Sequence, residues 1–469
     1  MARRRKKKVT ENITLTGLAD KGLAAGRDEE GIVYFVEGGV PGDVVDVMVT
    51  RKKSSFRKGF VTKFHKYSEE RIEPLCEHFG VCGGCKWQNL SYESQLKYKE
   101  QSILDAFKRI GHVEIGEIRP IVGCSAIFNY RNKMEYSFSD REWVSQELIQ
   151  TKEKIEFKQA VGFHRAGAFD KVVQIEKCHL QDDLSNEIRN SLHALALEND
   201  WSYYNARQHK GDFRNLRVRN TTLGEWMIVV IFGEQNDDAI DKTLEHFKTN
   251  FPQLTSIYYV VNKKMNDTIN DLDLTLYHGE PYITEQLGHI KYKIGPKSFF
   301  QTNTKQAEVL YDQIKTLANL KGDELVYDLY TGLGSIALYV ADQCKTVVGV
   351  EEIKEAIDDA NINKELNNIK NAHFEVGDVK DEFNGGFVEK YGNADLIIVD
   401  PPRAGLHHDV VEMLNKTNSP RIIYVSCNPS TQARDIALMS EYYNVELIQP
   451  VDMFPHTHHI ENIAVLNKK

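Results

Sequence analysis

Residues 425–430 read "VSCNPS", follow the apolar run "RIIY" and contain the cysteine Cys427. Free cysteine is among the most often buried residue types, so Cys427 taken alone is a small core residue. A thiol at a strand end can also be a nucleophile. Pro429 would then stiffen the turn, so that the sulfur is presented at the strand edge. The choice between these readings depends on what else the chain brings to that edge.

A strand, a glycine-rich turn and a helix follow one another in "VYDLYTGLGSIALYVA", at 326–341. Glycine lets the backbone turn tightly and approach a ligand, and the helix start offers free N–H groups. Glu351 follows Gly334 by seventeen residues, where a carboxylate can accept hydrogen bonds from ribose hydroxyls. The acidic residues that close four successive predicted strands are Asp328, Glu351, Asp378 and Asp400. This pattern predicts a nucleotide-type site at the carboxyl ends of the strands.

The ligand of that site could be a dinucleotide or S-adenosylmethionine. The turn lacks the third glycine that packs helix on strand in dinucleotide-binding folds, and it is led by the acidic "DLYTG". The "DPP" at 400–402 follows in the order seen in methyltransferases. These features favour S-adenosylmethionine.

A second group of cysteines has the spacing of metal ligands. Cys76, Cys82 and Cys85 stand in "LCEHFGVCGGCKWQ", and Cys178 follows in "EKCHL". Three thiols in a short glycine-rich loop are unusual for a core, so the array predicts a metal site. Spacing alone fits zinc as well as an iron–sulfur cluster.

The elements that must position these residues form three regions. Short β-rich pieces separated by turns at 10–65 predict a small closed barrel. A helix is expected from about 92 to 110, and the hydrophilic stretch 140–156 predicts a solvated hairpin tip. From about 295, apolar strands alternate with helical stretches, which predicts a parallel, doubly wound α/β sheet. The expected domains are 1–66, 67–292 and 293–469.

Composition and charge narrow the class of protein. The longest apolar runs are far too short to span a bilayer, and no apolar segment of a signal peptide follows the basic start. We therefore expect a cytoplasmic protein without a membrane partner, whose seven cysteines are reduced. Residues 1–65 hold 14 Lys and Arg against 8 Asp and Glu, although the whole chain carries −9. The six basic residues from Arg3 to Lys8 suit an arm that contacts nucleic acid phosphates.

Taken together, "DLYTGLGS", "DPPRAGL", "VSCNPST" and "FPHTHHIE" resemble the RNA uracil-C5 methyltransferase family. The segment "GGVPGDVVDV" is similar to the TRAM domain, an OB-like barrel at the front of RNA-modifying enzymes. The resemblance implies a Rossmann-like methyltransferase domain, a TRAM barrel and a central α+β iron–sulfur domain. The cysteine array resembles the branch that carries a [4Fe–4S] cluster and acts on 23S ribosomal RNA. A monomer is expected.

The resemblance implies a role for each matching position. Cys427 would be the nucleophile and Glu461 the general base. The residues that would contact S-adenosylmethionine are Gln301, Tyr330, Glu351, Asp378 and Asp400. The cluster ligands would be Cys76, Cys82, Cys85 and Cys178.

Uracil C5 is a weak nucleophile, which explains why these residue types are needed. Addition of the Cys427 thiolate at C6 makes an enolate whose C5 can accept a methyl group. Glu461 can then remove the C5 proton, and the thiolate is eliminated. A lowered pKa of Cys427 is expected beside Asp400 and Arg403. The basic segment 207–219, "RQHKGDFRNLRVR", is expected to grip RNA around an unstacked target base.

Three other functions remain open at this stage. One is the same C5 chemistry on transfer RNA. Another is methylation of an exocyclic amine, although such enzymes favour an N-P-P-aromatic motif where this chain has "DPPRAG". The third is an iron–sulfur RNA-binding protein without catalysis.

Overall fold

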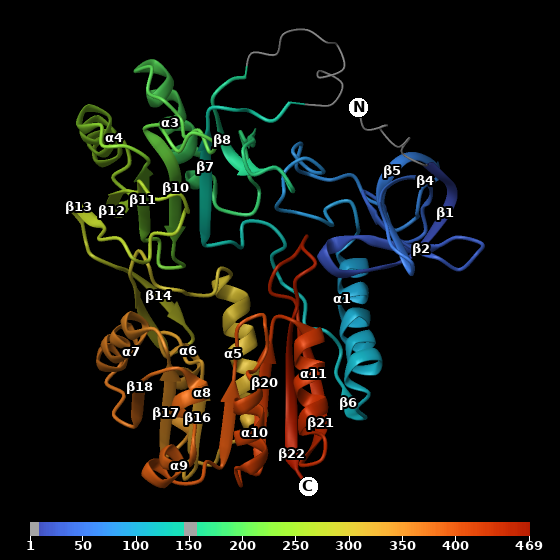
Figure 1. Ribbon diagram of the computed structural model, residues 1–469. Helices are drawn as coiled ribbons and strands as arrows, with labels where there is room; N and C mark the ends of the chain where they lie inside the picture. The colour runs from blue at the N-terminus through green and yellow to red at the C-terminus, as the bar shows by residue number, and fades with distance from the viewer. Residues whose placement is uncertain (1–8, 145–156) are drawn as a thin grey trace.

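A computed structural model of the chain describes residues 9–144 and 157–469. The expected basic arm at 3–8 and most of the hydrophilic stretch 140–156 lie outside these residues. Within them, the strands form a closed barrel, a seven-stranded sheet, a two-stranded sheet and an eight-stranded sheet (Figure 1). Among the described helices, none combines the length and the apolar character that crossing a membrane requires.

The N-terminal barrel confirms the closed β-structure expected for this region. Its strands follow the order β1-β2-β3-β5-β4. They are β1 (Val9–Leu18), β2 (Ala24–Arg27), β3 (Val33–Glu37), β4 (Val44–Lys52) and β5 (Phe56–Lys66). Alternate residues such as Ile13 and Leu15 point inward and form a small apolar core. The buried carboxylate of Asp43 pairs with Arg71 at 2.7 Å and ties the barrel to the chain that follows.

The central region is built on a sheet of order β13-β12-β11-β10-β7-β8-β9. Its strands are β7 (Lys133–Ser139), β8 (Ala160–His164), β9 (Val172–Gln174), β10 (Phe213–Asn220), β11 (Trp226–Phe232), β12 (Leu254–Val261) and β13 (Thr275–Gly279). The helices α3 (Asp183–Glu198) and α4 (Asp237–Asn250) share an apolar core with one face of this sheet. The hairpin β14 (Ile283–Leu287) and β15 (Ile290–Ile294) leads into the last region.

The C-terminal sheet has the order β18-β17-β16-β19-β20-β22-β21-β6. Its strands are β16 (Leu325–Leu329), β17 (Thr346–Glu351), β18 (Ala372–Val376), β19 (Leu396–Val399), β20 (Arg421–Ser426), β21 (Tyr443–Val451), β22 (Glu461–Lys468) and β6 (Ile115–Ile118). The run from β18 to β20 is parallel, whereas β22 is antiparallel to both of its neighbours. This arrangement confirms the doubly wound α/β fold.

Helices cover both faces of that sheet, which explains its continuous apolar strands. One core includes α5 (Thr304–Ala318) and α6 (Ser335–Val340). The other includes α10 (His408–Lys416), α11 (Pro429–Met439) and the more distant α1 (Tyr92–Ala106). The helices near the free edge are α7 (Lys354–Leu366), α8 (Val379–Glu382) and α9 (Gly385–Tyr391).

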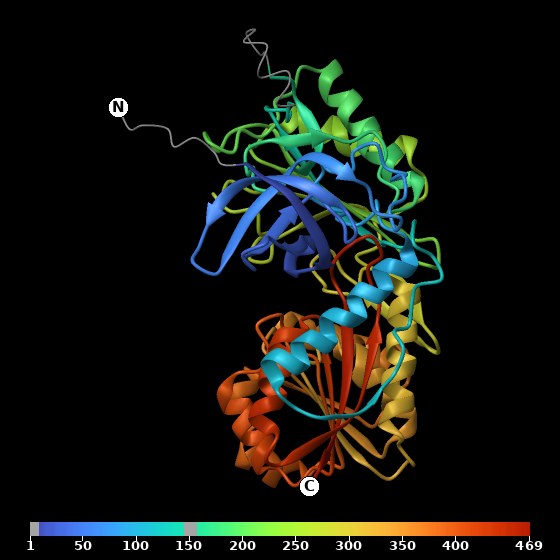
Figure 2. The same cartoon turned by 90° about the vertical axis from the view of Figure 1, so that its right-hand side faces the viewer.

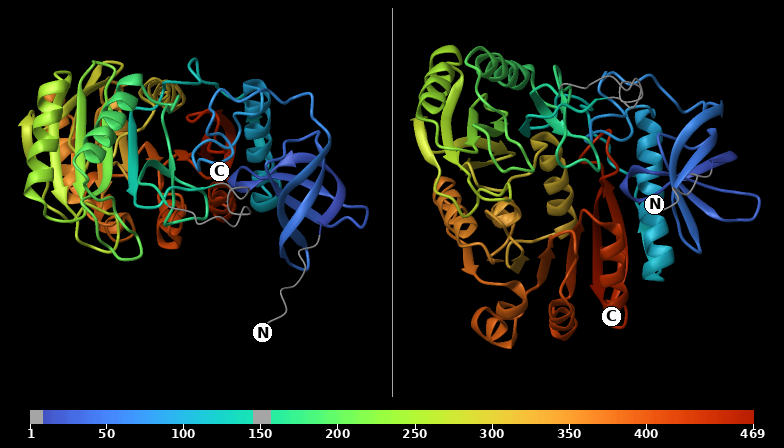
Figure 3. Two further views of the ribbon diagram at one scale, coloured as in Figure 1. Left: turned by 90° about the horizontal axis from the view of Figure 1, so that it is seen from above. Right: turned by 45° about the horizontal axis from the view of Figure 1, so that its top comes forward.

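The segment 92–118 crosses between regions. α1 confirms the helix expected there, and it runs between the barrel and the C-terminal sheet (Figure 2). β6 then pairs with β21 and becomes the last strand of the C-terminal sheet. The chain between β21 and β22 reaches back to lie between the barrel and the central sheet (Figure 3). The division at 66 and 292 stays a prediction, because the three regions share these elements.

Candidate active site

The antiparallel pairing of β20 with β22 brings Cys427 and Glu461 together. The ladder ends at the pair Ser426 and Asn462, so the next residues in register are Cys427 and Glu461. Residues directly opposite in such a ladder have Cβ atoms about 5 Å apart. Cys427 is half-buried, and Glu461 is 6% exposed. Two residues that are 34 positions apart therefore share one corner of the sheet.

Hydrogen bonds from Asn428 fix the turn that carries Cys427. The Asn428 side chain accepts from the Ser430 N–H and caps α11, whose first residue is Pro429. Its Nδ2 donates to the carbonyl of Arg403 at 2.9 Å. The proline thus begins a helix as well as stiffening the turn, and the asparagine joins the cysteine turn to the "DPPRAG" loop.

A buried carboxylate holds the other end of that loop. Asp435 Oδ2 accepts from the Leu406 N–H at 2.8 Å and from the Tyr424 hydroxyl at 2.7 Å. Gly405 has φ of 82°, and a Cβ there would lie 2.5 Å from the same oxygen. No motif signals Asp435 in the sequence, because its partners are a main-chain amide and a tyrosine on another element.

The electrostatics of this corner differ from the expectation for a reactive thiol. Burial raises the pKa of Cys427 to about 12, and the charges of Glu461 and Asp400 add to this, with Arg403 opposing. The expected lowering of the Cys427 pKa is therefore wrong for the ligand-free protein. Burial also raises the pKa of Glu461, with Asp400 next in importance. Burial raises the pKa of Asp400 to about 7, and the charge of Asp328 contributes.

Burial is the main cause of all three shifts, and the charges of the neighbouring acids add to it. A cation placed among them would lower the pKa of each acid and of the thiol. A methyl sulfonium carries such a charge. The arrangement therefore suits a cationic ligand.

Alkylation of Cys427 by iodoacetamide is expected to be slow at pH 7 in the ligand-free protein. With a pKa of about 12, about one thiol in 10⁵ is ionised at that pH. The rate should rise about tenfold per pH unit between pH 7 and 9, because the thiolate is the reactive form. Peptide mass spectrometry that follows Cys427 measures this rate. Rapid alkylation that does not change with pH would contradict the raised pKa.

The glycine-rich turn after β16 is shaped by backbone angles that suit a close ligand. Tyr330, Gly332 and Gly334 have φ of 68°, 57° and 79°. A Cβ on Gly334 would lie 2.8 Å from the Phe374 ring, so this position is closed to larger residues. Beneath the turn, Asp328 accepts from the Ala337 N–H at 3.0 Å and from the Thr331 hydroxyl. Its carboxylate supports the turn from within.

Glu351 lies at the rim of the turn, where the sequence predicts a ribose contact. Its two oxygens accept from the N–H groups of Gly332 and Ile353, each at 3.1 Å. Asp378 lies at the same sheet edge, but it caps α8 and pairs with Lys380 at 2.6 Å. Lys380 lowers the pKa of Asp378. Of the two acids, Glu351 is therefore the better placed for the cofactor.

Gln301 is held at the start of α5 by the central region. Asn132 donates to the main-chain carbonyl of Gln301 at 2.9 Å and to the Thr304 hydroxyl at 2.8 Å. Arg219 donates to the carbonyls of Gly295 at 3.3 Å and Ser298 at 3.0 Å. Burial, together with nearby Arg217, lowers the pKa of Arg219 to about 9.

Three of the four arginines in the segment 207–219 thus differ from the exposed RNA grip expected from its composition, while Arg207 is largely exposed. Arg214 and Arg219 are 5% and 4% exposed, and Arg217 pairs with Glu135 at 2.9 Å. Arg217 and Arg219 hold main-chain carbonyls of the loop that leads to Gln301, whereas Arg214 holds carbonyls at 262–266. The composition of the segment could not predict these contacts, because the strand pairing decides which face of the sheet each arginine occupies.

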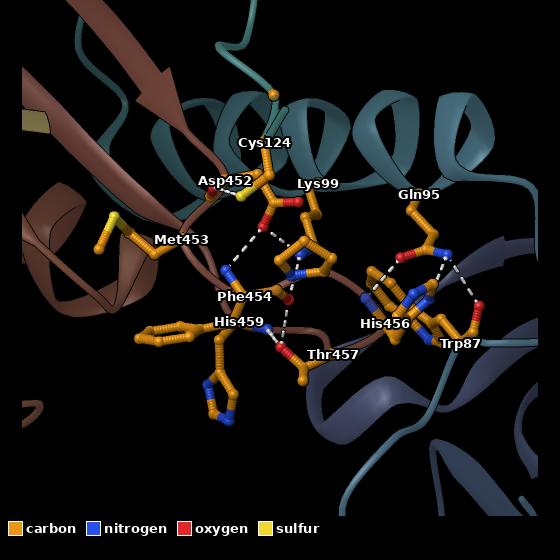
Figure 4. A network of polar contacts seen from close by, with 12 residues as sticks. Trp87, Gln95, Lys99, Cys124, Asp452, Met453, Phe454, His456, Thr457 and His459 are labelled. Carbon is orange, nitrogen blue, oxygen red and sulfur yellow. Dashed lines mark hydrogen bonds and ion pairs between the residues drawn. The ribbon is translucent and has the colours of Figure 1, made fainter. Parts of the chain in front are cut away.

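A network of buried polar groups holds the chain just before Glu461 (Figure 4). Lys99 pairs with Asp452 at 2.6 Å, with both side chains fully buried, and donates to the Phe454 carbonyl at 3.0 Å. The Tyr92 hydroxyl donates to the other Asp452 oxygen at 2.8 Å. All of these α1 groups converge on the β21–β22 loop.

The same loop is tied to the cysteine-rich segment. His456, with φ of 65°, donates its N–H to Gln95 at 2.7 Å. Its carbonyl accepts from the N–H groups of Lys86 at 2.8 Å and Trp87 at 3.0 Å. The chain beside Cys85 therefore supports the loop that ends at Glu461.

Replacing Lys99 by methionine is expected to lower the free energy of unfolding by about 3–5 kcal/mol, because it leaves the buried Asp452 carboxylate without its cationic partner. Urea unfolding of the full chain measures the change. The control is Lys97→Met on the same helix, where the ion pair with Glu70 is largely exposed. That variant should lose less than about 1 kcal/mol. Equal losses for the two variants would contradict the role given to the buried pair.

The four cysteines of the predicted metal site are neighbours in space. The pKa of each thiol is raised, above all by burial, and the charges of the other thiols contribute at Cys82, Cys85 and Cys178. Gln88 donates to the Cys85 sulfur at 3.3 Å. In the part of the chain that the structure describes, however, no three His, Cys, Asp or Glu side chains are arranged to hold a metal ion. The thiols are near one another but not in a ligand geometry.

Comparison with known proteins identifies the class. A family model described as "tRNA (Uracil-5-)-methyltransferase" matches residues 169–469, and a model described as "TRAM domain" matches residues 4–61. The doubly wound domain, its acidic edge and the TRAM barrel are those of an RNA methyltransferase. The chain belongs to the tRNA (uracil-5-)-methyltransferase family.

Relatives cover nearly the whole chain. A protein of Bacteroides thetaiotaomicron, named an uncharacterized RNA methyltransferase, is 48% identical over 93% of this chain and 96% of its own length. A Porphyromonas gingivalis protein of the same name is 44% identical over 96% and 98%. The crystal structure of Pyrococcus abyssi tRNA (uracil-54, C5)-methyltransferase with S-adenosyl-L-homocysteine has a TM-score of 0.74 at 30% identity. It covers 97% of this chain and 100% of that one.

Proposed function

We propose that the protein transfers a methyl group from S-adenosylmethionine to C5 of a uridine in RNA through a covalent bond between Cys427 and uracil C6. The observation that carries this proposal is the β20–β22 register. It puts a thiol and a buried carboxyl side by side at the sheet edge that also holds the glycine-rich turn and Glu351. Methylation of an exocyclic amine needs no such pair.

Each residue of the pair has one task. Cys427 adds to C6, and the electrons of the C5–C6 double bond move into an enolate. The methyl group of the donor bonds to C5 as its bond to the sulfonium sulfur breaks, and the donor leaves as a neutral thioether. Glu461, as its carboxylate, takes the C5 proton, and the Cys427–C6 bond breaks as the double bond forms again. Arg403 lies beside this corner and can stabilise the enolate oxygen.

The cofactor residues follow from the same geometry. Glu351 would bind the ribose, while the Gly332–Gly334 turn would approach the donor closely. Gln301, Tyr330 and Asp400 would line the rest of the S-adenosylmethionine site, and Asp378 would lie at the outer rim of that site. Calorimetry with S-adenosylmethionine and the parent protein tests this step. The proposal expects saturable binding that Glu351→Ala weakens about tenfold or more, and absence of binding by the parent would contradict it.

We infer that the substrate is ribosomal RNA, most specifically 23S rRNA. We also infer that the four cysteines are the ligands of a [4Fe–4S] cluster. The inference is supported by the cysteine spacing and by the closeness of the thiols. The Pyrococcus abyssi protein acts on tRNA, which makes transfer RNA the second candidate. Mass spectrometry of 5-methyluridine in both RNA classes from a strain lacking the protein distinguishes them. Loss from transfer RNA alone would contradict the ribosomal assignment.

Anaerobic purification tests the cluster independently of activity. Cys76, Cys82, Cys85 and Cys178 would supply four thiolates, the number that a [4Fe–4S] cluster requires. About four iron and four sulfide per chain are expected, with a broad visible absorption that Cys82→Ser removes. One zinc per chain, without sulfide, would contradict the cluster.

A further inference from the structure

Two strands of the central sheet carry a polar strip on the face away from α3 and α4. On the helix-covered face, Tyr136, Leu216 and Val218 belong to the apolar core. On the opposite face, three registered pairs join β7 to β10, and they are Lys133–Arg219, Glu135–Arg217 and Ser137–Asn215. On β11 the same face is apolar and buried, as at Val229. The arginines of the strip hold the chain at 295–298, whereas the Ser137–Asn215 end lines a cavity.

A cavity of about 390 Å³ opens at the Ser137–Asn215 end of the strip. This volume lies within the range of small-ligand sites. Its walls combine aromatic and imidazole rings with amide and hydroxyl groups, mainly Phe169, Tyr204, His164, His209 and Asn215. Phe169 is 69% exposed at the cavity, although a phenylalanine gains nothing from water there.

The Tyr204 ring in this cavity is held in place before any ligand arrives. The Arg214 guanidinium lies 4.3 Å from the ring centroid. Arg214 is itself fixed by the carbonyls of Lys264 at 2.6 Å and Asn266 at 2.7 Å. The Tyr204 hydroxyl lies 3.1 Å from His209 Nδ1. Tyr204 is therefore a fixed, buried part of the cavity wall, and the exposed Phe169 ring is the surface on which a flat heterocycle can stack.

The strand β7 links the cavity to the chain around Gln301, which is part of the proposed methyl-transfer site. Asn132, just before β7, holds the Gln301 carbonyl. The seven residues of β7 lead from there to the cavity, a span of roughly 20 Å. A single strand of RNA that passes the Gln301 end of β7 can reach the cavity by following this strand. On the rim, Arg207 is largely exposed beside Asp170, and it offers a cation near the backbone.

We propose that this cavity binds an unstacked base of the substrate RNA, a few nucleotides from the methylated uridine. The proposal rests on the proposed function for the identity of the RNA, but its chemistry is separate. Phe169 stacks on the base, and the imidazoles of His164 and His209 in the cavity wall offer hydrogen bonds to its edge. The cavity would help choose which RNA reaches Cys427 without touching the reacting atoms.

The test uses the full chain and a ten-nucleotide single-stranded RNA that contains 4-thiouridine. Ultraviolet crosslinking followed by peptide mass spectrometry should map adducts to the peptides that hold Phe169, His209 or Met265. Phe169→Ala should weaken binding of this RNA about 5- to 20-fold by fluorescence anisotropy. The matched control is Tyr442→Ala, an exposed aromatic next to β21, which should bind as the parent does. Binding of S-adenosylmethionine should be unchanged in both variants.

Equal RNA affinity of the parent and Phe169→Ala, with no adduct in these peptides, would overturn the proposal. Failure of the parent to bind the RNA at all would overturn it as well. Tight binding of free uridine monophosphate that Phe169→Ala abolishes, without RNA adducts, would assign the cavity to a nucleotide instead. None of these results affects the proposed methyl transfer, which is judged separately by the activity of Cys427→Ala.

Discussion

Replacing Cys427 by alanine is expected to lower methyl transfer to RNA by at least about 10⁴-fold. Without the thiolate, C6 receives no nucleophile, and C5 stays too weak a nucleophile for the sulfonium. Transfer of a radiolabelled methyl group to RNA measures the effect. Binding of S-adenosylmethionine should be kept, because Cys427 follows β20 whereas the glycine-rich turn follows β16.

The matched control is Cys344→Ala. Cys344 is a buried cysteine in the same sheet region, remote from the carboxyl edge, and should keep nearly all activity. A Cys427→Ala protein that retains a tenth or more of the parent activity would contradict the nucleophile assignment. It would instead favour methylation of an exocyclic amine.

Replacing Glu461 by glutamine is expected to trap the reaction after methyl transfer. The amide cannot take the C5 proton, so methylated RNA should stay bound to Cys427 and turnover should fall about 10²- to 10⁴-fold. The covalent complex should migrate as a slower band on a denaturing gel and carry the labelled methyl group. The double variant Cys427→Ala, Glu461→Gln is the control and should form no such band.

The same variant should be well folded, which keeps its result interpretable. The pKa of Glu461 is raised in the folded chain, so its ionisation costs stability as the pH rises from its ordinary value of 4.5 toward the folded value. Glutamine cannot ionise, so at pH 8 Glu461→Gln should unfold no more easily than the parent. Full turnover by a stable Glu461→Gln protein would show that another base removes the proton.

Local patterns were sufficient for much of the fold. The barrel, α1 and the parallel strands from β16 to β20 each follow from periodicity and turn residues within one segment. The position of Glu351 at a strand end was also predictable. Two features of the C-terminal sheet were not predictable, because they depend on pairing between strands that are far apart in the sequence. β22 enters the sheet between β20 and β21, and β6 adds to its far edge.

The residues of the site could be predicted from the sequence, whereas their closeness and the directions of their pKa shifts could not. Cys427 and Glu461 could be named from motifs, whereas their closeness depends on the β20–β22 register. The direction of the Cys427 pKa could not be read from neighbouring charges, because burial is the largest cause. Likewise, no sequence motif indicates that Lys99 and Gln95 support a loop more than 350 residues away.

Release of tritium from RNA labelled at uridine C5 tests the central claim most directly. Methylation through a Cys427–C6 adduct must remove the C5 hydrogen, so each methyl group gained should release one tritium to water. Counting both isotopes in one reaction with the parent protein gives this ratio. A ratio near one is the predicted result. Methylated RNA that keeps its C5 tritium would contradict the account.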